Sequence, residues 1–196
     1  MKRLLDVLLS LLALIVLLPL ELGIAVAILL SSPGRVLYRQ SRVGKNNVDF
    51  QLLKFRTMKT DADKNGELLT VGNDSRIIGC GHFLRKYKLD ELPQLLNIIK
   101  GDMSIVGPRP EVRKYVNLYD DRQRQVLSVR PGLTDYASIQ YIAESELLAN
   151  SPNPEKTYIE EIMPAKLELN LKYIEHQSLR EDIKLIFKTL LSIFQK

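Results

Sequence analysis

The first thirty residues form the feature that most constrains what this chain can become. Residues 7–20 carry no charged side chain, Glu21 interrupts the apolar run, and residues 22–30 resume it. Crossing the hydrocarbon core of a bilayer takes about 20 apolar residues in a helix. The sequence therefore predicts a membrane-inserted segment at the N-terminal end of the chain.

Two simple arrangements of this segment meet difficulties. A secretory signal peptide would use Lys2 and Arg3 as its basic region and residues 25–27 as an A-x-A cleavage site, but the apolar run continues past that site. A straight spanning helix conflicts with Pro19, which removes a backbone donor, and with Glu21, whose carboxylate is costly near the middle of a bilayer.

A third arrangement is a re-entrant hairpin over residues 1–34 that bends at Leu18-Pro19 and leaves the membrane on the side where it entered. Positive charge prefers the cytoplasmic side of a membrane. Both flanks of the segment are basic, with Lys2, Arg3, Arg35, Arg39, Arg42 and Lys45. We therefore favour the re-entrant form with a cytosolic domain over residues 35–196, and the spanning form stays open.

Composition bounds the remaining functions. The chain has 196 residues, of which 45% are hydrophobic, and a formal net charge of +5. A basic chain suits nucleic acid, anionic lipid or phosphorylated small molecules. The basic residues are scattered, and carboxylates stand in their strongest cluster, which argues against a nucleic-acid partner. The single cysteine, Cys80, excludes an intrachain disulfide.

Short strand-like segments and longer helical ones fit an α+β fold that is mainly helical, which is the fold that the resemblance described below implies. Residues 36–38 and 50–53 resemble short strands around a polar turn at 44–47. Residues 115–126 are expected to be helical. In the last helix, an apolar stripe either packs on the core or lies as an amphipathic helix in the membrane interface. Its members are Leu179, Ile183, Ile186, Leu190 and Ile193.

An apolar stripe also predicts a helix over residues 91–100, which Gly101 ends. Pro93 then belongs to the first turn, and Asp90 lies at or near the helix cap. Asp90 and Glu91 can simply cap this helix and favour its dipole. Basic residues surround the pair, however: Lys54, Arg56, Arg85, Lys86, Lys88 and Arg109.

Carboxylates among basic groups have a chemical interpretation. A helix N-terminus with basic groups binds phosphate, and carboxylates there can hold Mg²⁺ together with substrate phosphates. A carboxylate can also attack phosphorus to give an acyl phosphate. Pro108 and Pro110 would hold Arg109 in a fixed pose, which is useful against a phosphate or a planar base.

Taken together, these motifs resemble the small monotopic phosphoglycosyl transferases of the bacterial sugar transferase family. The resemblance starts in the N-terminal segment and ends at Thr134, so it covers most of the chain. Its ordered motifs are residues 2–3, 54–58, 73–77, 83–85, 89–94, 100–104, 106–111 and 129–134.

The resemblance implies an activity and its substrates. Such proteins transfer a sugar-1-phosphate from a UDP-sugar to undecaprenyl phosphate and release UMP, at the cytoplasmic face of the bacterial inner membrane. This is the first membrane step of surface polysaccharide or glycoconjugate synthesis. Partners would be the two substrates and membrane lipids, with no nucleic acid, and a homodimer stays open. A membrane-anchored basic scaffold or nucleic-acid-binding protein without catalysis is the alternative.

The resemblance also assigns residues. Asp90 would attack the sugar-bearing phosphorus and become an aspartyl-phosphosugar, with Mg²⁺ beside it. Glu91 would position or deprotonate the second substrate or help to hold the metal, and Arg85 corresponds to an active-site arginine. The expected substrate-binding residues, with the nucleotide placed near the Pro-Arg-Pro segment, are Lys54, Arg56, Pro108, Arg109, Pro110 and Arg130.

The chain departs from the family pattern in places. Leu18-Pro19 stands where Ser-Pro is common at the membrane bend. After Thr134, many members read Gly-Trp, whereas this chain has Asp135-Tyr136, and Ile142 stands near the place of a later arginine. These departures put the contacts of residues 135–142 with the sugar or diphosphate in doubt.

Overall fold

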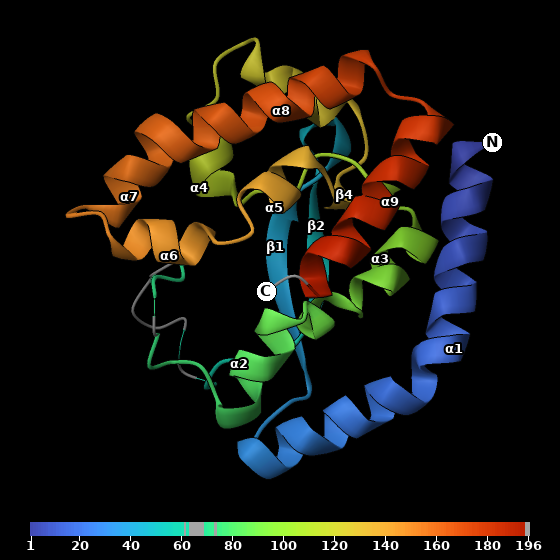
Figure 1. Cartoon of the computed structure of the whole chain (residues 1–196), viewed down its shortest axis with the longest axis vertical. Helices are drawn as coiled ribbons and strands as arrows, with labels where there is room; N and C mark the ends of the chain where they lie inside the picture. The colour runs from blue at the N-terminus through green and yellow to red at the C-terminus, as the bar shows by residue number, and fades with distance from the viewer. Residues whose placement is uncertain (61, 63–68, 73, 195–196) are drawn as a thin grey trace.

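Helix α1 (Lys2–Ser31) runs along one side of the molecule and then turns beneath it (Figure 1). The computed structural model describes residues 1–60, 62, 69–72 and 74–194. Pro19 lies inside α1. The expected helix–break–helix is therefore one continuous helix with a bend, which the missing proline N–H permits.

Both arms of α1 pack on the rest of the chain. In the first arm, Lys2 Nζ contacts Asp182 Oδ2 at 2.5 Å, and Asp6 Oδ2 accepts a hydrogen bond from Ser104 Oγ at 2.8 Å. In the second arm, Ile24 and Ile28 are buried in an apolar cluster. The predicted boundary between a membrane hairpin over residues 1–34 and a cytosolic domain over residues 35–196 stays a prediction.

The outer surface of α1 is apolar and exposed. Among the described residues, α1 is the one helix long and apolar enough to cross a membrane by length and composition. Large apolar side chains remain exposed along it, namely Leu4, Leu5, Leu8, Leu9, Leu11, Leu12, Ile15, Val16, Leu18, Leu20, Leu22, Val26, Leu29 and Leu30. So many exposed apolar groups are typical of a surface that another apolar phase covers.

The predicted strand pair is confirmed and is longer than expected. Strands β1 (Leu37–Val43) and β2 (Asp49–Phe55) form an antiparallel hairpin with the short 3₁₀ turn η1 (Lys45–Asn47) between them. Asn46 and Asn47 have φ values of 56° and 63°. Asparagine tolerates this left-handed region better than most residues, which explains the polar turn.

The helix expected over residues 91–100 begins later. Helix α2 (Gly79–Lys86) leads into the 3₁₀ turn η3 (Leu89–Glu91), and α3 spans Gln94–Lys100 with Gly101 as its C-cap. Pro93 is therefore the N-cap of α3, rather than part of its first turn. Consequently Asp90 and Glu91 lie in the separate turn η3, one turn before the helix.

A second, parallel sheet pairs β3 (Ser104–Val106) with β4 (Gly132–Thr134). Between them lie only α4 (Arg113–Val116) and the 3₁₀ segment η4 (Gln123–Ser128). The expected helix over residues 115–126 is thus wrong in extent, because the chain is not helical between Val116 and Gln123. The apolar spacing there instead places Tyr115, Val116 and Val126 in the main core.

The C-terminal part of the described chain is helical. It comprises α5 (Tyr136–Gln140), α6 (Glu144–Ala149), α7 (Pro154–Thr157), a π-helical turn η5 (Tyr158–Ile162), α8 (Met163–Glu175) and α9 (Leu179–Phe194). The structure thus confirms a mostly helical chain with small sheets.

Helix α9 does not bury its predicted stripe. Leu179, Ile183 and Leu190 are 44%, 48% and 51% exposed, whereas Asp182 and Leu185 face the interior at 5% and 0%. The first alternative, in which the stripe packs on the core, is therefore wrong for Leu179, Ile183 and Leu190. Of the other two residues of the stripe, Ile186 packs against a buried cluster and Ile193 is partly buried.

Candidate active site

A cleft of about 1690 Å³ lies between the β1–β2 hairpin, η3, the Pro-Arg-Pro segment and helices α5 and α8. Pockets for drug-sized ligands typically measure about 300–1,000 Å³. The cleft therefore has room for a ligand larger than one small molecule. The residues that line it lie between Gly34 and Asn170 in the sequence, and they include Lys54, Arg85, Asp90, Glu91 and Arg109.

The η3 turn places both carboxylates in this cleft. Lys88 precedes the turn in a left-handed conformation with φ of 57°, which redirects the chain after α2. Asp90 is 6% exposed and Glu91 is 7% exposed. None of the described residues donates a hydrogen bond to the buried Asp90 Oδ1. Asp90 therefore keeps an uncommitted oxygen in a basic cleft.

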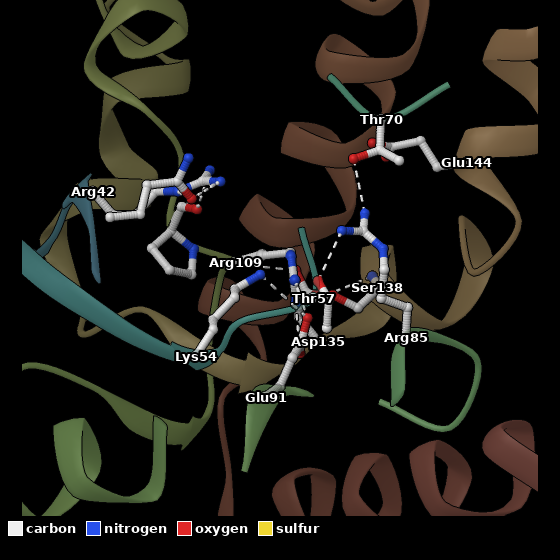
Figure 2. Close-up of polar contacts among 12 residues, drawn as sticks. Arg42, Lys54, Thr57, Thr70, Arg85, Glu91, Arg109, Asp135, Ser138 and Glu144 are labelled. Carbon is white, nitrogen blue, oxygen red and sulfur yellow. Dashed lines mark hydrogen bonds and ion pairs between the residues drawn. The ribbon is translucent and has the colours of Figure 1, made fainter. Parts of the chain in front are cut away.

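Glu91, by contrast, is fully engaged. The Arg109 guanidinium donates to both of its oxygens, with Nη1 at 3.2 Å from Oε2 and Nη2 in contact with Oε1. Lys54 Nζ lies 3.6 Å from Oε1. Figure 2 shows Lys54, Glu91 and Arg109 converging at the centre of the site. This two-point pairing fixes the plane of the guanidinium as well as its charge.

The two carboxyl groups have opposite electrostatic properties. Burial raises the pKa of Asp90 above its usual value, and the charge of Glu91 raises it further. Burial also opposes ionisation of Glu91, but Arg109, Lys54 and Lys88 outweigh it and hold the pKa of Glu91 well below its usual range. Glu91 is thus the member of the pair that ionises more readily.

The pKa values of the two neighbouring cations, Lys54 and Arg109, are shifted as well. Burial lowers the pKa of Lys54 to about 8, although the neighbouring charge of Glu91 acts in the other direction. The charge of Glu91 raises the pKa of Arg109 above its already high value. Arg109 therefore stays charged, whereas Lys54 can lose its proton within the range of ordinary buffers.

The Pro-Arg-Pro segment is held from several sides. Gly107 and Gly132 approach so closely that a Cβ on Gly132 would lie 2.1 Å from Gly107 N, which only glycine allows. Arg109 N donates to Asp135 Oδ2 at 3.2 Å, and Arg42 Nη1 donates to the carbonyl oxygen of Pro110 at 3.2 Å. The predicted rigidity of this segment thus comes from tertiary contacts as well as from its prolines.

Arg85 lies on the opposite wall. Its Nη2 donates to Thr70 Oγ1 at 2.8 Å, and its Nη1 donates to Thr57 Oγ1 at 3.4 Å (Figure 2). Both partners are neutral hydroxyl groups, so these two contacts do not neutralise the positive charge of Arg85. The cleft thus brings together Lys54, Arg85, the two carboxyl groups and the Pro-Arg-Pro segment, as the sequence predicts.

Two predicted substrate-binding arginines have other partners. Arg56 is 6% exposed, and it donates to Arg35 O at 2.7 Å, Ser32 Oγ at 2.9 Å and Ser32 O at 2.7 Å. It borders the cleft, but it ties the end of α1 to the hairpin. Arg130 is exposed, donates from Nε to Gly101 O at 2.9 Å and is not one of the described residues that line the cleft.

Sequence reasoning missed a second polar group at the cleft wall. Arg42 Nη1 lies 3.0 Å from Glu111 Oε1, and Tyr158 OH donates to Glu111 Oε2. This group fixes the end of the Pro-Arg-Pro segment. Glu111 directly follows that segment in sequence, which was a usable signal. Arg42 was noted only as a basic residue that flanks the N-terminal segment, and nothing in the sequence placed Arg42 or Tyr158 at the cleft.

The residues of the cleft fit one carboxylate ligand for a divalent cation. The described part of the chain contains no group of three or more His, Cys, Asp or Glu side chains placed to hold a metal ion. Mg²⁺ often binds through only one or two carboxylates together with substrate phosphates. Asp90, with its uncommitted Oδ1, suits that role, whereas the oxygens of Glu91 are occupied by Arg109.

The family model described as bacterial sugar transferase matches residues 1–196. The chain belongs to the bacterial sugar transferase family. The chain is 39% identical to the exopolysaccharide production protein PSS of Rhizobium leguminosarum bv. phaseoli, over 98% of this chain and 94% of that protein.

Larger relatives match over only part of their length. The chain is 36% identical to a UDP-N-acetylgalactosamine-undecaprenyl-phosphate N-acetylgalactosaminephosphotransferase of Aeromonas hydrophila, over 98% of this chain and 43% of that protein. It is 35% identical to a UDP-glucose:undecaprenyl-phosphate glucose-1-phosphate transferase of Escherichia coli (strain K12), over 99% of this chain and 40% of that protein. The chain therefore spans less than half the length of these two relatives.

Proposed function

We propose that the protein transfers a sugar-1-phosphate from a UDP-sugar to undecaprenyl phosphate and releases UMP. The names of the Aeromonas and E. coli relatives supply the two substrate classes. The cleft supplies suitable chemistry, because cationic side chains from β2, α2 and the Pro-Arg-Pro segment surround a carboxyl group. Such cations stabilise a diphosphate and the charge that develops during phosphoryl transfer.

Asp90 is the nucleophile in this proposal, and its uncommitted Oδ1 is the observation that carries it. An Asp90 oxygen attacks the sugar-bearing phosphorus of the UDP-sugar, and the bond from that phosphorus to the bridging oxygen breaks. UMP leaves with the electron pair, and an aspartyl-phosphosugar forms. An oxygen of undecaprenyl phosphate then attacks the same phosphorus and restores the Asp90 carboxylate.

Glu91 acts as the fixed anion that orients cations, rather than as a general base. A group whose pKa is held far below neutral is a poor proton acceptor at the operating pH. Its pairing with Arg109 and Lys54 instead aims both cations at one place in the cleft. Arg85 faces that place from the α2 side, with only hydroxyl groups as its partners in these contacts.

Mg²⁺ would supply charge neutralisation for the diphosphate when it is bound. Asp90 would hold it together with phosphate oxygens of the substrate. The role of Glu91 as a second metal ligand is not part of the proposal, because both of its oxygens face Arg109.

The apolar surface supports a site at the membrane boundary. One substrate is a soluble anion, and the other carries its phosphate on an isoprenoid tail within the lipid. Exposed apolar side chains on α1 and on the outer side of α9 suit contact with lipid. We place α1 as a re-entrant helix in the inner membrane, with the cleft on the cytoplasmic side, where basic flanking residues are favoured.

A UMP-release assay tests this function. The purified full chain is incubated with polyprenyl phosphate, Mg²⁺ and a panel of UDP-sugars. The proposal predicts UMP release with at least one sugar, its loss in Asp90→Asn and its retention in the control Asp121→Asn, which alters an exposed carboxylate. Absence of UMP release with every sugar, or an active Asp90→Asn variant, would overturn it.

A further inference from the structure

Asp135 connects two elements of the site through one buried carboxylate. It directly follows β4, is 0% exposed and is the N-cap of α5. Its Oδ1 accepts from Ser138 N at 2.6 Å, and its Oδ2 accepts from Arg109 N at 3.2 Å. Capping explains the first bond, since Asp is a preferred N-cap residue. It does not explain the second, which reaches across to another segment.

The bond to Arg109 matters because of what surrounds it. Pro108 and Pro110 have no backbone N–H, so Arg109 N is the one main-chain donor within the Pro-Arg-Pro segment. The orientation of this peptide decides where the Arg109 side chain begins. The guanidinium must then reach both oxygens of Glu91 in one plane. A rotation of the peptide would therefore disturb the pairing with Glu91.

Asp135 is itself held firmly. The Thr134 hydroxyl contacts the Thr189 hydroxyl on α9, and α5 packs on both α8 and α9. Figure 2 shows Asp135 and Ser138 close to the cluster of Lys54, Glu91 and Arg109. A rigid anchor of this kind can transmit a fixed position to the segment that it holds.

We propose that Asp135 is a positioning residue, which holds the main chain of Arg109 so that its guanidinium stays in register with Glu91. Its consequence for catalysis rests on the proposed function. Asp135 stands where the sequence departs from the family pattern. In this role it acts within the cleft in addition to capping α5.

Two substitutions separate capping from positioning. Asp135→Ala removes both bonds, so that stability and activity both fall. Asp135→Ser keeps an N-cap acceptor for Ser138 N, because Ser is a good N-cap, but its side chain is too short to hold Arg109 N as well. We expect Asp135→Ser to regain most of the melting temperature lost in Asp135→Ala while kcat stays lower by roughly 10²-fold.

Hydrogen exchange provides a readout that does not depend on the reaction. Within residues 108–110 only Arg109 carries an exchangeable backbone amide, because proline has none, so the exchange of that one amide is followed. We expect this amide to exchange faster in Asp135→Ser than in the unaltered protein, while peptides from α3 stay unchanged. Unaltered protection of Arg109 would overturn the inference even if the chain catalysed another reaction.

A double-mutant cycle with Arg109→Lys tests whether Asp135 acts through Arg109. If it does, Asp135→Ser should reduce kcat much less in the Arg109→Lys background than in the unaltered protein. Independent, multiplying losses would contradict positioning, as would a normal kcat in Asp135→Ser. Failure of the unaltered protein to release UMP would instead count against the proposed function, and hydrogen exchange would still decide the role of Asp135.

Discussion

Asp90 and Glu91 are adjacent in the η3 turn, yet the pKa of Asp90 is raised and that of Glu91 is lowered. The difference comes from contacts, because Arg109 pairs with both oxygens of Glu91, whereas Asp90 Oδ1 receives no hydrogen bond from any described residue. Opposite environments for two neighbouring carboxyl groups are a common way of assigning them different roles. Here Asp90 keeps an oxygen that is available for reaction, whereas Glu91 holds the cations Arg109 and Lys54 in place.

The geometry of the Arg109–Glu91 pair should matter more than its charge. Arg109→Lys keeps the positive charge but loses the planar two-point contact, so we expect kcat/KM for UMP release to fall by about 10²-fold. The control is Arg113→Lys, whose ion pair with Asp49 is exposed and should contribute about 1 kcal/mol or less. Equal effects of the two substitutions would show that the paired geometry is unimportant.

The fall of kcat/KM at low pH, which is the acid limb of the pH profile, should follow the protonation of Asp90. An attacking carboxylate must be ionised, and its raised pKa means that kcat/KM begins to fall at a higher pH than an ordinary aspartate, with a pKa of about 3.9, would give. Lys88 lowers the pKa of Asp90, so Lys88→Asn should move the limb to still higher pH, and Asn tolerates the positive φ at this position.

The matched control for that shift is Lys172→Gln, which removes an exposed positive charge from α8. It should leave the acid limb in place. A limb that moves equally in both variants would indicate an effect of net charge, rather than of the local environment of Asp90.

The change in KM at high pH, which is the alkaline limb of the profile, should follow the deprotonation of Lys54. With a pKa of about 8, Lys54 is charged below that pH and loses its proton above it, which removes a cation from Glu91 and from the substrate diphosphate. We therefore expect KM for the UDP-sugar to rise as the pH passes 8. Lys54→Arg should remove this limb, since arginine stays protonated. Persistence of the limb in Lys54→Arg would assign it to another group.

The contact between Lys2 and Asp182 should stabilise the attachment of α1. Asp182 is 5% exposed, and it accepts from Lys2 Nζ and from Tyr173 OH, each at 2.5 Å. Asp182→Ala removes the carboxylate that both donors share and leaves them longer bonds such as those to Val106 O, at 3.1 Å from Lys2 Nζ and 3.3 Å from Tyr173 OH. This loss should cost about 2 kcal/mol and lower the melting temperature by about 4–8 °C. The exposed pair of Glu168 with Arg122 gives the control, Glu168→Ala, for which the shift should be small.

Local sequence signals predicted the elements that depend on local chemistry. The polar turn before Val48 fixed the hairpin, because two asparagines adopt positive φ there. Gly101 ends α3 as expected, with φ of 106°. Pro93, however, was expected in the first helical turn and is instead the N-cap of α3, because Asp90 and Glu91 form the separate turn η3.

Tertiary partners account for what the sequence could not predict. The guanidinium of Arg56 holds backbone groups at the end of α1, although its place beside Lys54 suggested a ligand. Asp135 could have been recognised as an N-cap residue from its position before a short helix, but not as a partner of Arg109, which is 26 residues away. Contacts between distant segments leave no periodic signal in a sequence.

Intact-mass analysis of the protein after reaction with the donor alone tests the central claim most directly. With a UDP-sugar that supports UMP release, Mg²⁺ and no polyprenyl phosphate, the unaltered chain should gain the mass of one sugar phosphate and release an equal amount of UMP. Addition of polyprenyl phosphate should remove that mass, and Asp90→Asn should never acquire it. An adduct that forms equally in Asp90→Asn, or rapid turnover that never passes through an adduct, would contradict the role of Asp90 as nucleophile.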